Sequence, residues 1–354
     1  MTLRQSSGPA TGLRDRLLAL VDQFRNRRVL VVGDIIADEF IYGQVSRVSR
    51  EAPVLILKYD ATEMVGGGAG NAANNVAALG ARARLAGLVG ADREGTRLIA
   101  SLHRGIERSY IARERGYRTP VKTRILAGGI HSAKQQVVRI DREPGWPLPD
   151  ETGRKLGPRL ASAVADCDAV VLSDYGSGLI TPALADGIRS SLERSPGQSV
   201  PVLVDSRYRL LEHHGMTICT PNEAEVEQML GVRIDDDQDR LERAGREILK
   251  RTGAAAVLVT RGSRGMALFQ RKQQTIHISI FGSDEVADVT GAGDTVIATV
   301  ALSLAAGASF EEAARLANYA GGLVVMKRGT ATVSPRELTA AVESDLGGKS
   351  SVGS

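Results

Sequence analysis

Short runs of β-branched residues alternate with longer amphipathic segments along most of this chain. The runs have the length of buried strands, and the segments between them have the apolar spacing of helices. Strand–helix alternation of this kind predicts an α/β fold, with a parallel sheet covered by helices on both faces. The expected strands are 29–32, 83–88, 169–172, 202–204, 217–219 and 256–259, and the expected helices are 69–79, 93–102, 151–165, 181–192, 223–230, 239–250, 292–306 and 310–325.

Two segments interrupt the alternation, because they contain β-type runs with no helix between them. Strands are expected there at 54–58, 121–126 and 135–140. We expect a small sheet, built from about residues 42–60 and 116–141, that projects from the main domain and covers a site as a lid. Its strands are short and separate from the main sheet, and edges of this kind favour a homodimer formed through the lid.

The composition excludes several classes of function. The 354-residue chain has a net charge of only +4 and 4% aromatic residues, without a basic run interleaved with aromatics. We therefore expect no nucleic-acid partner. A signal-like N-terminus and an apolar segment of about 18 residues are both missing, which favours a cytoplasmic protein without membrane contact.

The ends and the cysteines add little chemistry. Residues 1–12 and 346–354 are rich in small and polar residues and are expected to be loose, which leaves 13–345 as a single domain. Cys167 and Cys219 lie in apolar runs far apart in the sequence and are expected to be reduced thiols in the core.

The stretch 288–295 carries the clearest chemical signal. It consists of DVTGAGDT and leads into an apolar run at 296–306 that predicts a buried helix. Small residues allow backbone amides to approach a ligand, and the start of a helix attracts anions. Beside a bound phosphate, Asp294 could take a proton from an attacking hydroxyl. An isolated string of this kind is more often a glycine-rich turn capped by aspartate.

Two segments nearer the N-terminus combine glycines with polar side chains. The first expected strand ends at Gly33 and Asp34, so that Asp34 and Asp38 follow it and either bind sugar hydroxyls or cap a turn. The run 66–74, GGGAGNAAN, leads into a helix and satisfies G-x-G-x-x-A. That dinucleotide fingerprint belongs after the first strand, and no G-x-x-x-x-G-K-S/T motif occurs. A dehydrogenase or a P-loop enzyme is therefore disfavoured.

Asn222 and Glu225 stand at the start of another expected helix, directly after a strand. Residues at this position are usually caps. Because they are three apart on one helix face, they could instead hold the water shell of Mg²⁺. The segment 260–265, TRGSRG, lies between two strands and is either a hairpin turn or a loop that contacts a nucleotide.

Together these motifs resemble the ribokinase-like (PfkB) family of carbohydrate kinases. Residues 67–73, with Gly80 and Gly90, resemble its N-terminal signature, 288–294 its C-terminal signature, and Asn222 with Glu225 its Asn-x-x-Glu motif. The resemblance covers roughly residues 28–340. It implies a three-layer α/β/α sandwich with a small projecting β lid, and transfer of the γ-phosphoryl group of ATP to a small-molecule sugar with the help of Mg²⁺.

The resemblance also implies a role for each motif. Asp294 would be the catalytic base, and the amides of Gly291, Ala292 and Gly293 would form the anion hole. Asp288 and Thr290 match part of a monovalent cation site, of the kind that binds K⁺. The implied ATP and Mg²⁺ residues are Asn222, Glu225, Thr260, Gly262, Gly265 and Asn318, and the implied sugar residues are Asp34, Asp38, Gly67, Gly68, Asn71 and Asp174.

Within the family, the chain is most similar to the heptose 7-phosphate kinases, which phosphorylate the anomeric hydroxyl of that sugar for ADP-heptose synthesis. The similarity rests on VVGD at 31–34, SRVSREAP at 46–53, QQ at 135–136, LSDY at 172–175 and GTATVSP at 329–335. The chain departs from that subgroup at Ser177, where lysine is usual, at 205–207, where DSR replaces Asp-Pro-Lys, and at 127–133, which resembles an insertion. No His-x-Gly-His occurs among its five histidines, so a nucleotidyltransferase half is not expected.

The missing lysine removes a charge that would hold a substrate phosphate. Lys122 and Arg124 are the first choices to replace it, because residues two apart on a strand face the same side. A kinase of another sugar or of a nucleoside remains an alternative, and so does a catalytically idle sugar-binding regulator, although the retained Asp294 argues against the latter. Further basic residues that could compensate are Arg47, Lys134 and Arg207.

Overall fold

A mostly parallel sheet forms the centre of the molecule. The computed structural model describes residues 9–128, 134–144, 148, 151–193, 199–282, 288–327 and 329–346. The strands run in the order β13-β12-β11-β10-β9-β8-β1-β3-β4, and antiparallel pairing in this series is confined to β11/β12 and β12/β13. The strands of this sheet are β1 (Arg28–Val48), β3 (Arg82–Gly90), β4 (Ile106–Glu107), β5 (Ile111–Glu114), β8 (Ala169–Asp174), β9 (Val202–Ser206), β10 (Ile218–Cys219), β11 (Ala256–Thr260), β12 (Met266–Gln270) and β13 (Ile276–Ile278).

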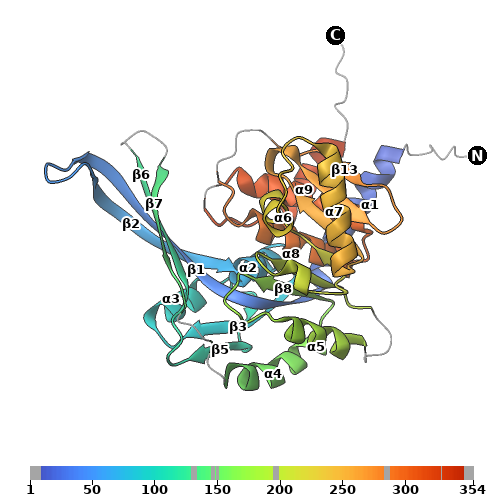
Figure 1. Cartoon of the computed structure of the whole chain (residues 1–354), viewed down its shortest axis with the longest axis horizontal. Coiled ribbons are helices and arrows are strands. Elements are labelled where there is room, and N and C mark those ends of the chain that lie inside the picture. Colours follow the sequence, from blue (N-terminus) through green and yellow to red (C-terminus); the bar gives the residue numbers. More distant parts are fainter. Residues whose placement is uncertain are drawn as a thin grey trace, which may run out of the picture.

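Helices cover both faces of the sheet and enclose two separate apolar cores (Figure 1). On β1, Val29 and Val31 belong to one core, whereas Leu30 and Val32 belong to the other, as the two-residue period of a strand requires. The first core is closed by α1 (Pro9–Gln23), α2 (Ala69–Ala78), α3 (Arg93–Ser101), α8 (Ala292–Ala305), α9 (Phe310–Val325) and α10 (Pro335–Leu346), and the second by α4 (Glu151–Val164), α5 (Pro182–Glu193), α6 (Glu223–Leu230) and α7 (Gln238–Thr252). Short 3-10 helices lie at η1 (Phe24–Asn26), η2 (Leu210–Glu212) and η3 (Gly262–Arg264).

A lid of four strands projects from this body (Figure 1, left). It consists of the second half of β1 together with β2 (Leu55–Gly68), β6 (Val121–Gly128) and β7 (Gln135–Arg142). β2 runs antiparallel to β1, β6 runs parallel to β1, and β7 runs antiparallel to β6. The three-layer sandwich with a projecting lid is therefore confirmed.

The lid is continuous with the main sheet, and this corrects two expectations. The first strand was expected to end at Gly33 and Asp34, but β1 has 21 residues, extends to Val48 and passes from the main sheet into the lid. Gly33 allows β1 to lie close to β8, because a Cβ at this position would overlap the carbonyl of Ser173 on β8. The lid strands are thus neither short nor separate, since β1 joins them to the body.

The chain ends also differ from expectation. α1 begins at Pro9 and α10 ends at Leu346, so residues 9–12 and 346 are helical rather than loose. The rest of the tails, 1–8 and 347–354, and the core of the expected insertion, 129–133, lie outside the described residues. β4, β5, β12, β13, α1 and α10 were not expected. β4 and β13 have only two and three residues, and α10 buries only Leu338, Ala341 and Val342.

Both cysteines lie in the core as free thiols, as expected, and burial raises the pKa of each to about 12. Within the described part of the chain, no helix combines the length and the apolar character that crossing a membrane requires.

Candidate active site

The start of α8 leaves backbone amides open toward the site. Its N-cap, Gly291, has a φ of +80°, and no side chain caps the helix. A Cβ at Gly291 would lie 2.9 Å from Thr330 and would overlap Asn71, so only glycine fits here. Ala292 donates its amide to Val289 at 3.2 Å, which removes one of the three amides expected in the anion hole. Among the described residues, the amide of Gly293 has no acceptor, as is usual in a first helical turn.

Asp294 lies in that first turn and points into the protein. The residue is only 3% exposed. One carboxylate oxygen accepts a hydrogen bond from Asn71 Nδ2 at 2.9 Å, and the other accepts one from the Tyr175 hydroxyl at 3.1 Å. Burial raises the pKa of Asp294 to about 7, although both hydrogen bonds act to lower it. A carboxylate with a pKa near neutrality is suited to accept a proton from a hydroxyl and to release it again.

α2 holds the amide of Asn71 in the orientation that Asp294 needs. Asn75, one turn further along α2, donates to the backbone oxygen of Asn71 at 3.0 Å and to its side-chain oxygen at 3.2 Å. Thr295 in turn donates to Asn75 at 3.0 Å. Sequence reasoning identified Asn71 but missed Asn75, Thr295 and Tyr175. The spacing of Asn71 and Asn75 at i and i+4 was an available signal.

Asp34 and Asp174, both expected to hold the sugar, are occupied by protein groups. Asp34 accepts from the amides of Tyr175 at 2.8 Å and Ser177 at 3.1 Å, and also from the Ser177 hydroxyl. Asp174 accepts from Ser206 Oγ at 2.7 Å and has His213 Nε2 at 3.7 Å. The two carboxylates therefore fix the loop after β8, and this loop places Tyr175 against Asp294.

The lid contributes a basic inner face. Lys122 and Arg124 do face the same side of β6, as expected: Arg124 forms an ion pair with Asp38, and the Lys122 ammonium lies 4.9 Å from the centre of the Tyr175 ring. Asp38 also lies against Gly67, where a Cβ would overlap its carboxylate. A cavity of about 230 Å³ opens between the lid and the loop at 175–177.

Asp205 lies beside the start of α8 and interacts with two other carboxylates, Glu225 and Asp294. Burial raises the pKa of Asp205 well above its usual value, and Glu225 and Asp294 raise it further. Burial also raises the pKa of Glu225. Sequence reasoning gave Asp205 no role, because only the fold brings it close to Asp294. In the described part of the chain no three such side chains are placed to ligate an ion together. Oxygen donors of this kind fit Mg²⁺, which keeps several of its waters.

Asn222 and Glu225 form a capping box at the start of α6. Asn222 Oδ1 accepts from the Glu225 amide at 2.9 Å, and Glu225 Oε2 accepts from the Asn222 amide at 2.9 Å. This is the usual role of such residues at a helix start. The geometry also places the Glu225 carboxylate close enough to Asp205 to affect its pKa.

The segment 260–265 is the turn of the β11–β12 hairpin and includes η3. Gly262 and Gly265 have φ values of +56° and +76°, and a Cβ at Gly265 would overlap the carbonyl of Ile278. Thr260 donates its amide to Pro221 at 3.0 Å, which ties the hairpin to the start of α6. Asn318 donates to the carbonyl of Ser279 at 2.8 Å and lines a cavity of about 570 Å³.

Asp288 connects the segment before α8 to a distant loop. Its carboxylate accepts from the amide of Thr290 at 2.9 Å and from the amide of Gly329 at 3.1 Å. The structure thus brings Asp288 and Thr290 together, and Asp288 fixes the backbone that precedes the helix start.

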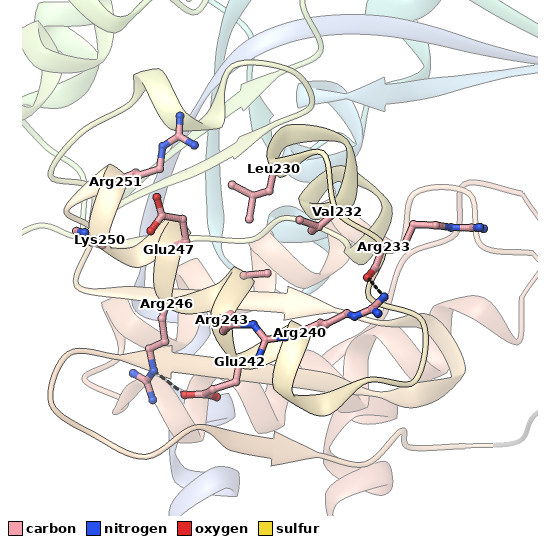
Figure 2. Close-up of a pocket in the computed structure, with 11 residues that line it drawn as sticks. Leu230, Val232, Arg233, Arg240, Glu242, Arg243, Arg246, Glu247, Lys250 and Arg251 are labelled. Carbon is pink, nitrogen blue, oxygen red and sulfur yellow. Dashed lines mark hydrogen bonds and ion pairs between the residues drawn. The ribbon is translucent and has the colours of Figure 1, made fainter.

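A larger hollow, of about 960 Å³, lies between α7 and the segment at the end of α6 and is lined mainly by charged side chains (Figure 2). Arg246 pairs there with Glu242 at 2.8 Å, and Arg240 donates to the carbonyl of Arg233 at 3.1 Å. None of its lining residues belongs to the constellation around Asp294. The size of a cavity therefore does not identify the site in this protein, whereas the chemistry of the lining does.

Comparison with known proteins identifies the family of this chain. Residues 26–337 match the model of the pfkB family of carbohydrate kinases. The chain is 40% identical over 336 residues to the bifunctional protein HldE of Trichlorobacter lovleyi, covering 93% of this chain and 65% of that protein. It is 42% identical over 337 residues to the protein of the same name from Caulobacter vibrioides, covering 94% of this chain and 67% of that protein. The chain thus spans about two thirds of the length of these relatives.

Solved structures share the fold at lower identity. Arabidopsis thaliana ribokinase complexed with ribose and ATP aligns with a TM-score of 0.68 at 21% identity, covering 90% of this chain and 99% of that chain. Escherichia coli phosphofructokinase-2 in complex with potassium aligns with a TM-score of 0.69 at 19% identity, covering 91% of this chain and 99% of that chain. These alignments confirm the ribokinase-like fold. The family match over most of the sequence and the identity to the two proteins named HldE show that the chain belongs to the pfkB family of carbohydrate kinases.

Proposed function

We propose that this chain transfers the γ-phosphoryl group of ATP to the anomeric hydroxyl of a heptose 7-phosphate, with Asp294 as the base. The observation that carries the proposal is the start of α8. There a buried carboxylate whose pKa burial raises to about 7 lies beside an uncapped helix N-terminus. A base near neutrality next to open amides is the pairing that phosphoryl transfer to a hydroxyl requires.

Each residue of the site has one task in this mechanism. The sugar oxygen attacks the γ-phosphorus, its proton moves to Asp294, and the bond between the γ-phosphorus and the bridging oxygen breaks to release ADP. Asn71 and Tyr175 hold the carboxylate toward the hydroxyl. The open amide of Gly293 and the positive end of α8 stabilise the charge on the phosphoryl oxygens.

Two ions belong to this proposal. Mg²⁺ would be held through its waters by Asp205 and Glu225, together with the ATP phosphates, where it neutralises charge on the phosphoryl oxygens. A monovalent cation is supported by Asp288 beside Thr290 and by the potassium complex of E. coli phosphofructokinase-2. The nucleotide would extend from α8 toward Thr260, Gly262, Gly265 and Asn318, a direction supported by the ATP complex of A. thaliana ribokinase.

The heptose substrate is supported by the similarity to heptose 7-phosphate kinases and by the identity to proteins named HldE. A homodimer through the lid is supported by apolar side chains that the lid leaves exposed. Leu55 on β2 is 48% exposed, and Val138 and Ile140 on β7 are 48% and 50% exposed. Exposed apolar strands of this kind need a partner or a cover.

A substrate panel tests the proposal. ADP release is measured by a coupled assay with hexoses, pentoses, nucleosides and a heptose with and without a 7-phosphate, and ³¹P NMR locates the new phosphate on the product. We expect the highest kcat/KM for the heptose 7-phosphate, with the new phosphate on the anomeric oxygen. A higher kcat/KM for a nucleoside or a pentose would overturn the substrate assignment. ATP binding without sugar-dependent ADP release would indicate a sugar-binding regulator.

A further inference from the structure

The cavity between the lid and the loop at 175–177 contains two cations that form no ion pair with a carboxylate among the described residues. Lys122 on β6 and Arg207, directly after β9, both line it and are termed the cavity cations. Tyr175 forms part of the same wall: Lys122 lies over its ring, and its hydroxyl donates to Asp294. The Tyr175 side chain therefore lies between the cavity and the proposed base, Asp294.

Other basic groups of the inner lid face are already paired. Arg124 pairs with Asp38, with only 11% and 8% of their side chains exposed. Arg139, which also lines the cavity, donates to both oxygens of Asp141, at 2.9 and 3.0 Å. Among the described residues, by contrast, no carboxylate lies within ion-pair distance of either cavity cation.

Besides Asp141, two acids line the cavity, Asp34 and Glu143. Glu143 is exposed, so that solvent screens its charge. The carboxylate of Asp34 is occupied by the backbone and hydroxyl of the loop at 175–177. Burial lowers the pKa of Lys122; Asp38 partly offsets this effect, and Arg207 adds to it. Two cations without an ion-pair partner in one cavity are stabilised by an anion, and lysine and arginine are the side chains that bind phosphate groups.

We propose that Lys122 and Arg207 bind a phosphate carried by the sugar at the end remote from the reacting hydroxyl. The proposal rests on the proposed function for its substrate. A sugar with one hydroxyl at Asp294 extends past Tyr175 into the cavity, which brings its far end between the two cations. Arg207, directly after β9, supplies the charge that Ser177 lacks. Arg124 is a positioning residue that holds Asp38, which revises its expected role as a phosphate ligand.

The phosphate subsite is tested in the whole chain by comparing two substrates, heptose 7-phosphate and the unphosphorylated heptose. We expect Lys122→Met and Arg207→Gln each to raise the KM for heptose 7-phosphate about 10- to 100-fold, the worth of one charge-assisted hydrogen bond, with a small change in kcat. The KM for the unphosphorylated heptose should change less than about threefold. Arg139→Gln is the matched control, because Asp141 already neutralises that guanidinium. It should raise the KM for heptose 7-phosphate less than Lys122→Met or Arg207→Gln does. Equal loss for both sugars would overturn the proposal and assign Lys122 to the transferring phosphoryl group.

A binding experiment separates the subsite from the reaction. Inorganic phosphate is titrated calorimetrically into the wild type and into the Lys122→Met/Arg207→Gln double variant, without nucleotide. We expect affinity to fall at least about tenfold in the double variant. If this loss occurs but no sugar is phosphorylated, the subsite stands and the proposed function fails. If heptose 7-phosphate is turned over and phosphate binds both proteins equally, the function stands and the subsite is overturned.

Discussion

Helices α6 and α8 both begin beside Asp205, and their first turns are built in opposite ways. α6 closes its own start, because Asn222 and Glu225 satisfy each other's amides in a capping box. α8 has glycine as its N-cap, no side-chain cap, and an acidic third residue that turns inward to Asn71 and Tyr175. An acid in the first turn thus stabilises one helix and leaves the other open to a ligand.

The difference between the two helix starts indicates that the proposed catalytic group lies at the uncapped one. The capped start of α6 is stable in the absence of ligand. The start of α8, by contrast, carries a carboxylate that burial shifts toward its neutral form. Such a group destabilises the ionised protein and persists only where the surrounding structure holds it. The comparison predicts that changes at α8 affect catalysis more than folding, and that changes at α6 affect folding and metal use.

The largest expected effect is that of Asp294→Asn. The amide can accept from Asn71 and donate to Tyr175, so the fold should persist, but it cannot accept the hydroxyl proton. We expect kcat to fall about 10²- to 10⁴-fold, measured by coupled ADP release, with ATP affinity nearly unchanged. Turnover close to that of the wild type would remove Asp294 from the mechanism.

The same substitution should stabilise the protein at high pH. The pKa of Asp294 is raised from 3.8 to about 7, so the native carboxyl keeps its proton while the unfolded one releases it. Stability from this group therefore falls as pH rises between these values and is lost above about pH 7. Relative to wild type, Asp294→Asn should gain about 2–3 kcal/mol in unfolding free energy between about pH 5 and pH 8, measured with urea. If the difference in unfolding free energy between the two proteins did not change with pH, burial would not destabilise the ionised carboxylate of Asp294.

The sequence predicted the layers of the fold and the start of α8, but not the distant partners that determine what each carboxylate does. The alternation of strands and helices and the glycine run before α8 predicted the layers and the start of that helix. Asp34 and Asp294, however, follow similar local patterns, and only distant partners distinguish them. Asn71 and Asp294 are 223 residues apart, and Asp34 is 141 residues from Tyr175. Long-range contacts of this kind, like the passage of β1 into the lid, are set by packing rather than by local sequence.

Glu225→Gln tests whether the capped helix also serves the metal. Glutamine can still accept from the Asn222 amide, so the cap should survive while one negative charge is lost. We expect the Mg²⁺ concentration for half-maximal rate to rise about 10- to 100-fold, as for other groups that act through a metal's water shell. Glu312→Gln, at the capping box of α9, is the matched control and should leave that concentration unchanged. A change confined to the KM of the sugar would place Glu225 in a different subsite.

The smallest effect is expected for Asn222→Ala. Loss of an N-cap costs about 1 kcal/mol, which for a chain of this size lowers Tm by roughly 2 °C. Asp237→Ala removes the cap of α7 and should cost a similar amount without any change in kinetics. A stability loss from Asn222→Ala several times that of Asp237→Ala would show that α6 depends on more than its cap.

The pH dependence of kcat/KM tests the central claim, that Asp294 is the base, most directly. It is measured with an unphosphorylated heptose at saturating ATP and Mg²⁺, because a substrate phosphate itself titrates near pH 6. The pKa of about 7 for Asp294 predicts that kcat/KM falls tenfold per pH unit below about pH 7 and is constant above it. The residual activity of Asp294→Asn should lack this acid limb. A wild-type profile that stays flat from about pH 5.5 to pH 8.5, or the same limb in the variant, would contradict the account.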